Sequence, residues 1–172
     1  MNYLSLNPFT EQTLGVFDCE AADQVDQKCQ ALDRAAVKFK VVPLSERLAS
    51  IDHVKTCLET HQERLATAIS TEMGKVYTEA LAEVNKSIGL CDYYINQGQQ
   101  LFSDLQQSDV LVQPLGLILA IMPWNYPLWQ VVRVLIPQLL VGNVVLFKPA
   151  LNTSIFSFVL ADLLADLGMV DF

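Results

Sequence analysis

The stretches LILAIMPWNYP (residues 117–127) and GNVVLFKPA (residues 142–150) decide the fold of this chain. The first begins as a continuous apolar run and ends with an asparagine between two prolines, and the second ends with a single lysine. Continuous apolar runs of this length are typical of strands that are buried on both faces of a parallel sheet. The pattern therefore predicts two parallel strands, with Asn125 and Lys148 at their carboxyl ends, where α/β enzymes place ligands and catalytic groups.

Helical and strand-like segments alternate through the last third of the chain. We predict a strand at 117–122, a helix at 128–141, a second strand at 143–147 and a second helix at 155–167. Pro137 should kink the first helix or end its first part, because proline lacks the N–H that continues a helix. Residues 152–154 can cap the second helix, and Gly168 would end it. This alternation of strands and helices indicates an α/β fold with a parallel sheet.

The beginning of the chain is predicted to be a turn followed by helices. Residues 7–17 are typical of a turn that can form a small hairpin. A helix is predicted at 21–39 from the spacing of its apolar residues. After Pro43, a second helix is expected to start with Ser45 as its N-cap and to carry an apolar face that reaches Ile69.

A long amphipathic helix is predicted at residues 77–105. Its charged residues are expected to form a solvated face: Glu79, Glu83 and Lys86. A short strand at residues 110–112 should follow, before the chain reaches the first buried strand.

Composition argues against several classes of function. The formal net charge of −8 argues against nucleic acid and against an anionic membrane surface as partners. Prolines and polar residues interrupt the apolar region 110–147, so no segment reaches the roughly 20 residues that a membrane span needs. The sequence shows no signal-peptide pattern, and we expect a cytoplasmic protein.

The four cysteines form no metal-binding pattern: Cys19, Cys29, Cys57 and Cys91. There is no C-x-x-C pair, and neither His53 nor His61 has metal-ligand spacing to a cysteine, so we expect no metal site. Free thiols in a reducing cytosol are the favoured interpretation. The alternative, a nucleophilic thiol, is disfavoured because none of the four lies in a recognisable site.

Several short motifs, taken in order, resemble one enzyme family. They are EMGK at 72–75, EA at 79–80, EV at 83–84, LGL at 115–117, IMPWNYP at 121–127, GN at 142–143 and KPA at 148–150. Together they closely resemble the aldehyde dehydrogenase superfamily, and PLWQVVR at 127–133 resembles its succinate-semialdehyde dehydrogenase branch. The resemblance implies a helical segment at 1–108, an oligomerisation-arm strand at 109–116, and the first part of a Rossmann-like NAD(P)-binding sheet at 117–172.

The resemblance also implies an activity, the NAD(P)+-dependent oxidation of an aldehyde to an acid. In the family, a cysteine thiolate attacks the aldehyde, hydride passes to the nicotinamide, and water releases the acid from a thioester. Asn125 matches the oxyanion-hole amide, a kind of donor typically worth a factor of ~10²–10³ in rate. The alternative is an asparagine that satisfies only its own turn. Arg133 matches the arginine that holds the far carboxylate of a semialdehyde; the alternative is an ordinary surface arginine.

Six residues match cofactor-binding positions of the family: Ile121, Met122, Pro123, Trp124, Lys148 and Leu151. Lys148 matches the lysine that binds the adenosine ribose, although a lysine that only snorkels from the sheet edge would look the same. Leu151 stands where NAD-preferring members often carry a glutamate. Without that carboxylate a 2′-phosphate is not repelled, so NADP is slightly favoured over NAD. Trp124 could equally be a core residue.

Other segments of the family have no counterpart here. The glycine-rich segment after the next strand, the segment with the general base and the catalytic cysteine are not found in the sequence. We therefore expect a truncated N-terminal portion that lacks the catalytic domain and is inactive alone. Its complete form is expected to act on a small aldehyde and to be a homo-oligomer. The alternative is a non-catalytic fragment that serves as a folding or binding partner.

Overall fold

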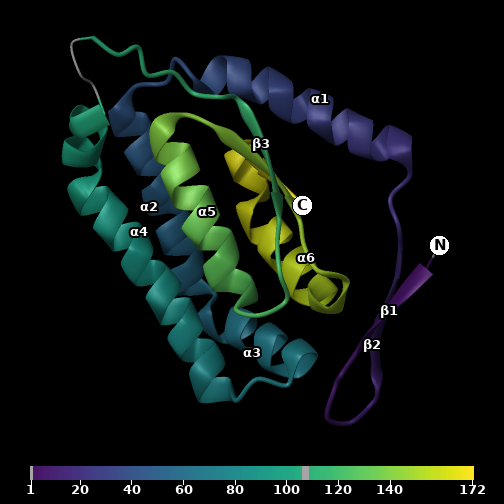
Figure 1. Ribbon diagram of the computed structural model, residues 1–172. Helices are drawn as coiled ribbons and strands as arrows, with labels where there is room; N and C mark the ends of the chain where they lie inside the picture. Colours follow the sequence, from purple (N-terminus) through teal and green to yellow (C-terminus); the bar gives the residue numbers. More distant parts are fainter. Residues whose placement is uncertain (1, 106–108) are drawn as a thin grey trace.

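The computed structural model describes residues 2–105 and 109–172, and Figure 1 shows how its elements are arranged. In chain order they are β1 (Asn2–Leu6), β2 (Thr13–Asp18), α1 (Ala22–Phe39), α2 (Leu44–Thr60), α3 (Gln62–Met73), α4 (Tyr77–Leu105), β3 (Leu117–Ile121), α5 (Pro127–Val141), β4 (Val144–Lys148), α6 (Ser154–Leu164) and β5 (Val170–Asp171). Two 3-10 turns flank α6, η1 (Leu151–Thr153) and η2 (Ala165–Leu167). The predicted α/β class is confirmed.

A three-stranded parallel sheet forms the centre of the fold. Its strand order is β3-β4-β5, with β4 in the middle. The connections through α5 and α6 cross the sheet in the same direction, so right-handed crossovers place both helices on one face. Helix α1 packs against all three strands from the other face (Figure 1). Helix α4 packs on α5 and α3 packs on α6, which adds an outer helical layer.

The GN motif closes the connection from α5 to β4. Gly142 ends α5 with a φ of 90°, a left-handed conformation that favours glycine. A Cβ there would also lie 2.8 Å from the guanidinium carbon of Arg47, which is buried. The side chain of Asn143 accepts the N–H of Gly116 at 2.9 Å, so it ties the start of β3 to the start of β4. These contacts fix the register in which the two strands pair.

The hairpin and the long helices confirm the predictions for the beginning of the chain. Strands β1 and β2 pair in antiparallel fashion, and α1 and α4 lie where the apolar periodicity placed them. The middle helix differs, because the backbone leaves the helical conformation at His61 and divides it into α2 and α3. Ser45 is not an N-cap: Pro43 occupies that position, and Ser45 lies in the first turn of α2.

Neither a helix end at Pro137 nor the predicted strand at 110–112 is observed. Helix α5 continues through Pro137 to Val141, while the alternative of a kink at Pro137 stays a prediction. The proline removes only one backbone hydrogen bond, and apolar packing on both sides holds the helix together. The strand predicted at 110–112 does not form. A strand needs a partner for its backbone groups, and no other described segment pairs with this one.

None of the helices in the described part of the chain combines the length and the apolar character that crossing a membrane requires.

Candidate functional site

The carboxyl ends of β3 and β4 bring the predicted site residues to one edge of the sheet. Ile121 and Lys148 are register partners, and the N–H of Met122 donates to the carbonyl oxygen of Lys148 at 3.0 Å. Asn125 lies in the turn between β3 and α5, and Leu151 begins the 3-10 turn after β4. Two strand–helix junctions therefore stand side by side at this edge.

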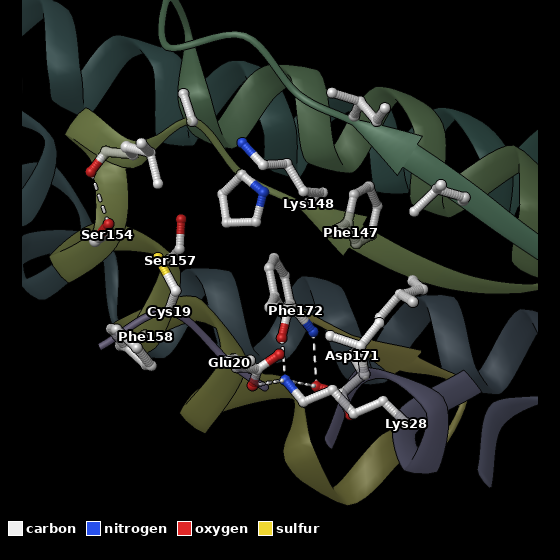
Figure 2. Close-up of a pocket in the computed structure, with 18 of the residues that line it drawn as sticks. Cys19, Glu20, Lys28, Phe147, Lys148, Ser154, Ser157, Phe158, Asp171 and Phe172 are labelled. Atoms are coloured by element: carbon white, nitrogen blue, oxygen red, sulfur yellow. Dashed lines mark hydrogen bonds and ion pairs between the residues drawn. The ribbon is translucent and has the colours of Figure 1, made fainter. Parts of the chain in front are cut away.

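A cavity of about 520 Å³ opens beside the end of β4 (Figure 2). Its floor is apolar and comes from the sheet, with Leu119, Ile121, Leu146 and Phe147. Lys148 and Leu151 lie at one side of it, together with residues of α6. This volume is in the range that small-molecule and cofactor sites occupy.

A cluster around Lys28 forms the opposite side of the cavity, as Figure 2 shows. The Nζ of Lys28 lies 2.8 Å from Glu20 Oε1 and 3.4 Å from Asp171 Oδ1, and it also donates to the carbonyl oxygen of Phe172. Burial disfavours the charge of Lys28, but hydrogen bonding and attraction to Glu20 and Asp171 outweigh it and raise the pKa of Lys28. One ammonium group thus faces the carboxylates of Glu20 and Asp171, and Asp18 also lines this side, so the side keeps a net negative charge.

Lys148 differs from Lys28 because it is exposed and forms no ion pair with any described residue. Its ammonium group is therefore a cation at the strand end that is available to a ligand. Together with the apolar floor, it gives this side of the cavity one positive charge beside a large apolar surface. That combination suits an aromatic base attached to a hydroxylated or phosphorylated sugar.

The junction between β3 and α5 is a strained turn held by a partly buried ion pair. Tyr126 has a φ of 53°, which is uncommon for a residue other than glycine and costs of order 1–2 kcal/mol. The N–H groups of Leu128 and Trp129, at the start of α5, donate to Oε1 of Glu83 at 2.9 and 3.0 Å. Oε2 of Glu83 accepts a hydrogen bond from Lys75 Nζ at 2.6 Å. The exposed side chain of Asn125 lies in the turn that these contacts hold.

The prediction that Glu83 belongs to a solvated face is wrong, since this residue is only 2% exposed. Glu79 and Lys86 are exposed as predicted. Helix α4 packs on α5 as well as on α2 and α3, so its buried stripe is wider than one amphipathic face. One feature of the sequence could have indicated a buried Glu83. Helix α5 begins after Tyr126, which supplies no capping oxygen, so the acceptor for its first N–H groups had to come from another element.

The junction between β4 and α6 is capped in the same way by Glu72. Its two carboxylate oxygens accept the N–H groups of Ile155 and Phe156, each at 2.9 Å. The hydroxyl of Ser5, from β1, donates to the same carboxylate at 2.6 Å.

The predicted cap by residues 152–154 is therefore wrong: no side chain of this segment caps α6. The hydroxyls of Thr153 and Ser154 donate to backbone carbonyls of the preceding turn instead. Gly168 does end the helical segment, with a φ of 64°.

The structure brings three of the predicted cofactor residues together and leaves the others outside the cavity. Ile121, Lys148 and Leu151 line it. The lining does not include the remaining site residues: Met122, Pro123, Trp124, Asn125 and Arg133. Trp124 is 58% exposed, so it is not a core residue of this chain. Arg133 is exposed and lies near the middle of α5.

The cysteines give the described residues no evident nucleophile. Cys91 is buried, and burial raises the pKa of its thiol to about 12, so it stays protonated at neutral pH. The Sγ of Cys57 lies 3.5 Å from Nε2 of His53, but burial raises the pKa of this thiol, and neither residue lines the cavity. Cys19 is exposed and lines the cavity, but no hydrogen bond connects it to a base in the described structure. The described residues also hold no cluster of side chains suited to a metal ion.

Comparison with known proteins finds relatives along almost the whole chain. The model of the "Aldehyde dehydrogenase family" matches residues 2–170. A probable succinate-semialdehyde dehydrogenase [NADP(+)] from Synechocystis is 33% identical over 98% of this chain. The succinate semialdehyde dehydrogenase [NAD(P)+] Sad of Escherichia coli is 34% identical over 96% of it. The crystal structure of succinic semialdehyde dehydrogenase from Streptococcus pyogenes with NADP+ superposes with a TM-score of 0.88 over 98% of the chain, at 25% identity.

The chain spans only part of these relatives. The matched region is 38% of the Synechocystis protein and 37% of the E. coli protein, and 40% of the S. pyogenes chain. The 172 residues thus correspond to one portion of a larger family architecture.

Proposed function

The chain belongs to the aldehyde dehydrogenase family, and we propose that it forms the N-terminal part of an NAD(P)+-dependent enzyme that oxidises succinate semialdehyde to succinate. One observation carries the proposal. Ile121 and Lys148 are register partners beside a cavity of about 520 Å³, and Asn125 lies in the turn that follows the same strand end. Because the chain spans about two fifths of its relatives, the activity is proposed for the complete protein.

The cavity fits the adenosine part of the cofactor. Its apolar floor suits an adenine ring, and Lys148 offers a cation to the ribose hydroxyls or to a 2′-phosphate. Leu151 leaves that side without a carboxylate, which favours NADP, and the relatives from Synechocystis and Streptococcus pyogenes carry NADP in their names. When bound, the cofactor supplies the hydride acceptor of the reaction.

Asn125 would stabilise the charge that develops on the aldehyde oxygen. As a thiolate adds to the carbonyl carbon, that oxygen becomes negative, and a positioned amide N–H stabilises it more strongly than it stabilises the neutral aldehyde. The strained turn fixes the backbone on which this amide stands. None of the described cysteines is evidently activated, so we propose that the thiolate comes from the portion that this chain does not contain.

Arg133 would bind the far carboxylate of succinate semialdehyde. An arginine fork can bind a carboxylate through two parallel hydrogen bonds, which distinguishes a short oxo-acid from a plain aldehyde. Arg133 is exposed and forms no ion pair with the described residues, so its guanidinium is available to a ligand.

The proposal is tested by joining this chain to the remaining segment of the E. coli relative and assaying the product. We expect NADPH formation from succinate semialdehyde and NADP+ by the joined protein and none by the 172-residue chain alone. Arg133→Ala should raise KM for succinate semialdehyde about tenfold and leave an uncharged aldehyde such as butanal unchanged. Equal losses for both aldehydes would show that Arg133 is structural. If the 172-residue chain alone turned over substrate and Cys19→Ala abolished that activity, the proposal that the thiolate comes from the remaining portion would be contradicted.

We also propose that the complete protein is a homo-oligomer that uses residues 109–116 as an arm. Val110, Leu111 and Leu115 are 57%, 82% and 86% exposed, and the segment pairs with no described strand. Exposed apolar segments with free backbone groups are ready to pair with a second chain. Light scattering should report a mass above that of the monomer, and Leu111→Lys should lower it. A monomer at micromolar concentration would favour the alternative of a fragment that persists by itself or as a binding partner.

A further inference from the structure

We propose that Glu83, acting with Lys75, is a positioning residue for Asn125, because the two side chains fix the turn in which Asn125 lies. This inference rests on the proposed function, since that function gives Asn125 its role. Glu83 comes from α4 and Lys75 from the loop before it, far in sequence from the turn at residues 124–126. Neither residue touches the cavity, so each would act on the reaction only through the turn.

The Glu83 carboxylate connects three separate groups within the protein. One oxygen accepts the N–H groups of Leu128 and Trp129, and the other accepts the ammonium group of Lys75. The carboxylate is fully buried and the Lys75 side chain is 15% exposed. A charge-assisted network of this kind is short, directional and shielded from water, so it holds the start of α5 in one place.

Lys75 extends the network to Tyr126, the residue directly after Asn125. Its ammonium nitrogen lies 3.8 Å from the centre of the Tyr126 ring, within the range of a cation–π contact. The backbone of Lys75 is itself held, because its carbonyl oxygen accepts the hydroxyl of Ser70 at 2.8 Å. Tyr126 has a positive φ and precedes Pro127, a position that disfavours the right-handed helical conformation. An uncommon conformation of this kind persists only where its surroundings enforce it.

Glu72 shows that capping a helix does not require such a network. It caps α6 through the same kind of hydrogen bonds, but its third partner is the neutral hydroxyl of Ser5. In the junction that Glu72 holds, no non-glycine residue has a positive φ. Of the two junctions, only the one with the strained residue Tyr126 has a cation beside its capping glutamate. This cation, Lys75, contacts the ring of Tyr126 itself.

The chain provides its own reporter for the mobility of the turn. It contains two tryptophans, Trp124 and Trp129, so Trp129→Phe leaves Trp124, next to Asn125, as the single fluorophore. In this background, Glu83→Gln keeps an oxygen that can accept the N–H groups of α5 but places an amide NH2 against the ammonium group of Lys75. Lys75→Met removes the cation, and Lys75→Arg restores it.

The test is time-resolved anisotropy of Trp124 in the purified 172-residue chain, well below the unfolding temperature of each variant. We expect Glu83→Gln and Lys75→Met to increase the amplitude of fast local motion at least twofold and Lys75→Arg to return it to the starting value. Glu72→Gln is the matched control, because it weakens a buried carboxylate cap of the same kind and should leave Trp124 unchanged. Glu83 would be a structural residue only, and the proposal overturned, if Trp124 moved equally in Glu83→Gln and Glu72→Gln.

Folding and function are separated within the same experiment. If Glu83→Gln fails to fold, Lys75→Met and Lys75→Arg carry the comparison, and equal mobility in those two variants overturns the proposal. A titration of the same samples with NADP+ tests the proposed function independently. Absence of NADP+ binding would count against the cofactor site while the anisotropy result still decides whether Glu83 and Lys75 hold the turn.

Discussion

Two strand–helix junctions lie at the edge of the sheet, one between β3 and α5 and the other between β4 and α6. They share one kind of helix cap but differ in strain and in their access to the cavity. In each, a buried glutamate from an outer helix caps the helix that follows the strand, Glu83 for α5 and Glu72 for α6. The first junction adds the partly buried cation of Lys75 and a strained residue, Tyr126. The second adds a 3-10 turn and opens onto the cavity.

This difference indicates how one sheet edge can support both chemistry and ligand binding. In the proposed function Asn125 is the catalytic amide, which has to stand at one place, and the strained turn with its ion pair limits where Asn125 can be. A cofactor site needs room and an accessible charge, and the second junction provides a cavity and the exposed ammonium group of Lys148. Separate glutamates allow the two loops to be fixed independently.

The largest expected effect separates the two junctions by their kinetic parameters. In the joined enzyme, Asn125→Ala should lower kcat by ~10²–10³ with little change in the KM for NADP+, because the lost contact strengthens in the transition state. Lys148→Ala should instead raise the KM for NADP+ roughly tenfold, since it removes a contact present throughout the reaction. Steady-state assays with both substrates varied measure this. A fall in kcat for Lys148→Ala and none for Asn125→Ala would reverse the assignment of the junctions.

The second prediction concerns the stability of the two caps. Glu83→Ala should lower the free energy of unfolding by about 3 kcal/mol, because it leaves the cation of Lys75 and two N–H groups without their acceptor. For a chain of this length that corresponds to a fall in Tm of roughly 6–12 °C. Glu72→Ala should cost about 1–2 kcal/mol, since no cation loses its partner. Thermal unfolding followed by circular dichroism distinguishes these values, and equal losses would mean that the ion pair adds nothing.

Much of the sheet edge could be predicted from the sequence because its signals are local. Continuous apolar runs mark β3 and β4, and the polar residues that follow mark their ends, so Asn125 was correctly placed after β3 and Lys148 at the end of β4. Their roles in catalysis and cofactor binding remain predictions. The cavity could not be predicted, because one of its walls comes from residues near Lys28, which are distant in sequence.

The glutamate caps illustrate what local patterns miss. An amphipathic pattern assigns a charged residue to the solvent, and Glu83 was assigned so. Its burial depends on α5, which starts more than forty positions later and supplies the two N–H donors. The same reason explains the wrong cap at residues 152–154, because the true cap, Glu72, lies on α3. When the free N–H groups at the start of a helix are bonded by a side chain that is distant in sequence, no periodic pattern in the sequence reveals it.

The smallest expected effect sharpens the role of the second junction in choosing a cofactor. Leu151 is 53% exposed at the side of the cavity, three residues after Lys148, so a glutamate can be placed there without disturbing the core. In Leu151→Glu the new carboxylate would repel a 2′-phosphate, and it would accept hydrogen bonds from the ribose hydroxyls of NAD+. We expect affinity for NADP+ to fall about tenfold and affinity for NAD+ to stay within about twofold, a difference near 1.4 kcal/mol.

Leu151→Gln is the matched control, because it has the same shape without the charge and should retain NADP+ binding. If both variants weakened NADP+ equally, the shape of the turn and not its charge would select the cofactor. The repulsion should also weaken as salt is raised, since the carboxylate would be exposed and subject to screening.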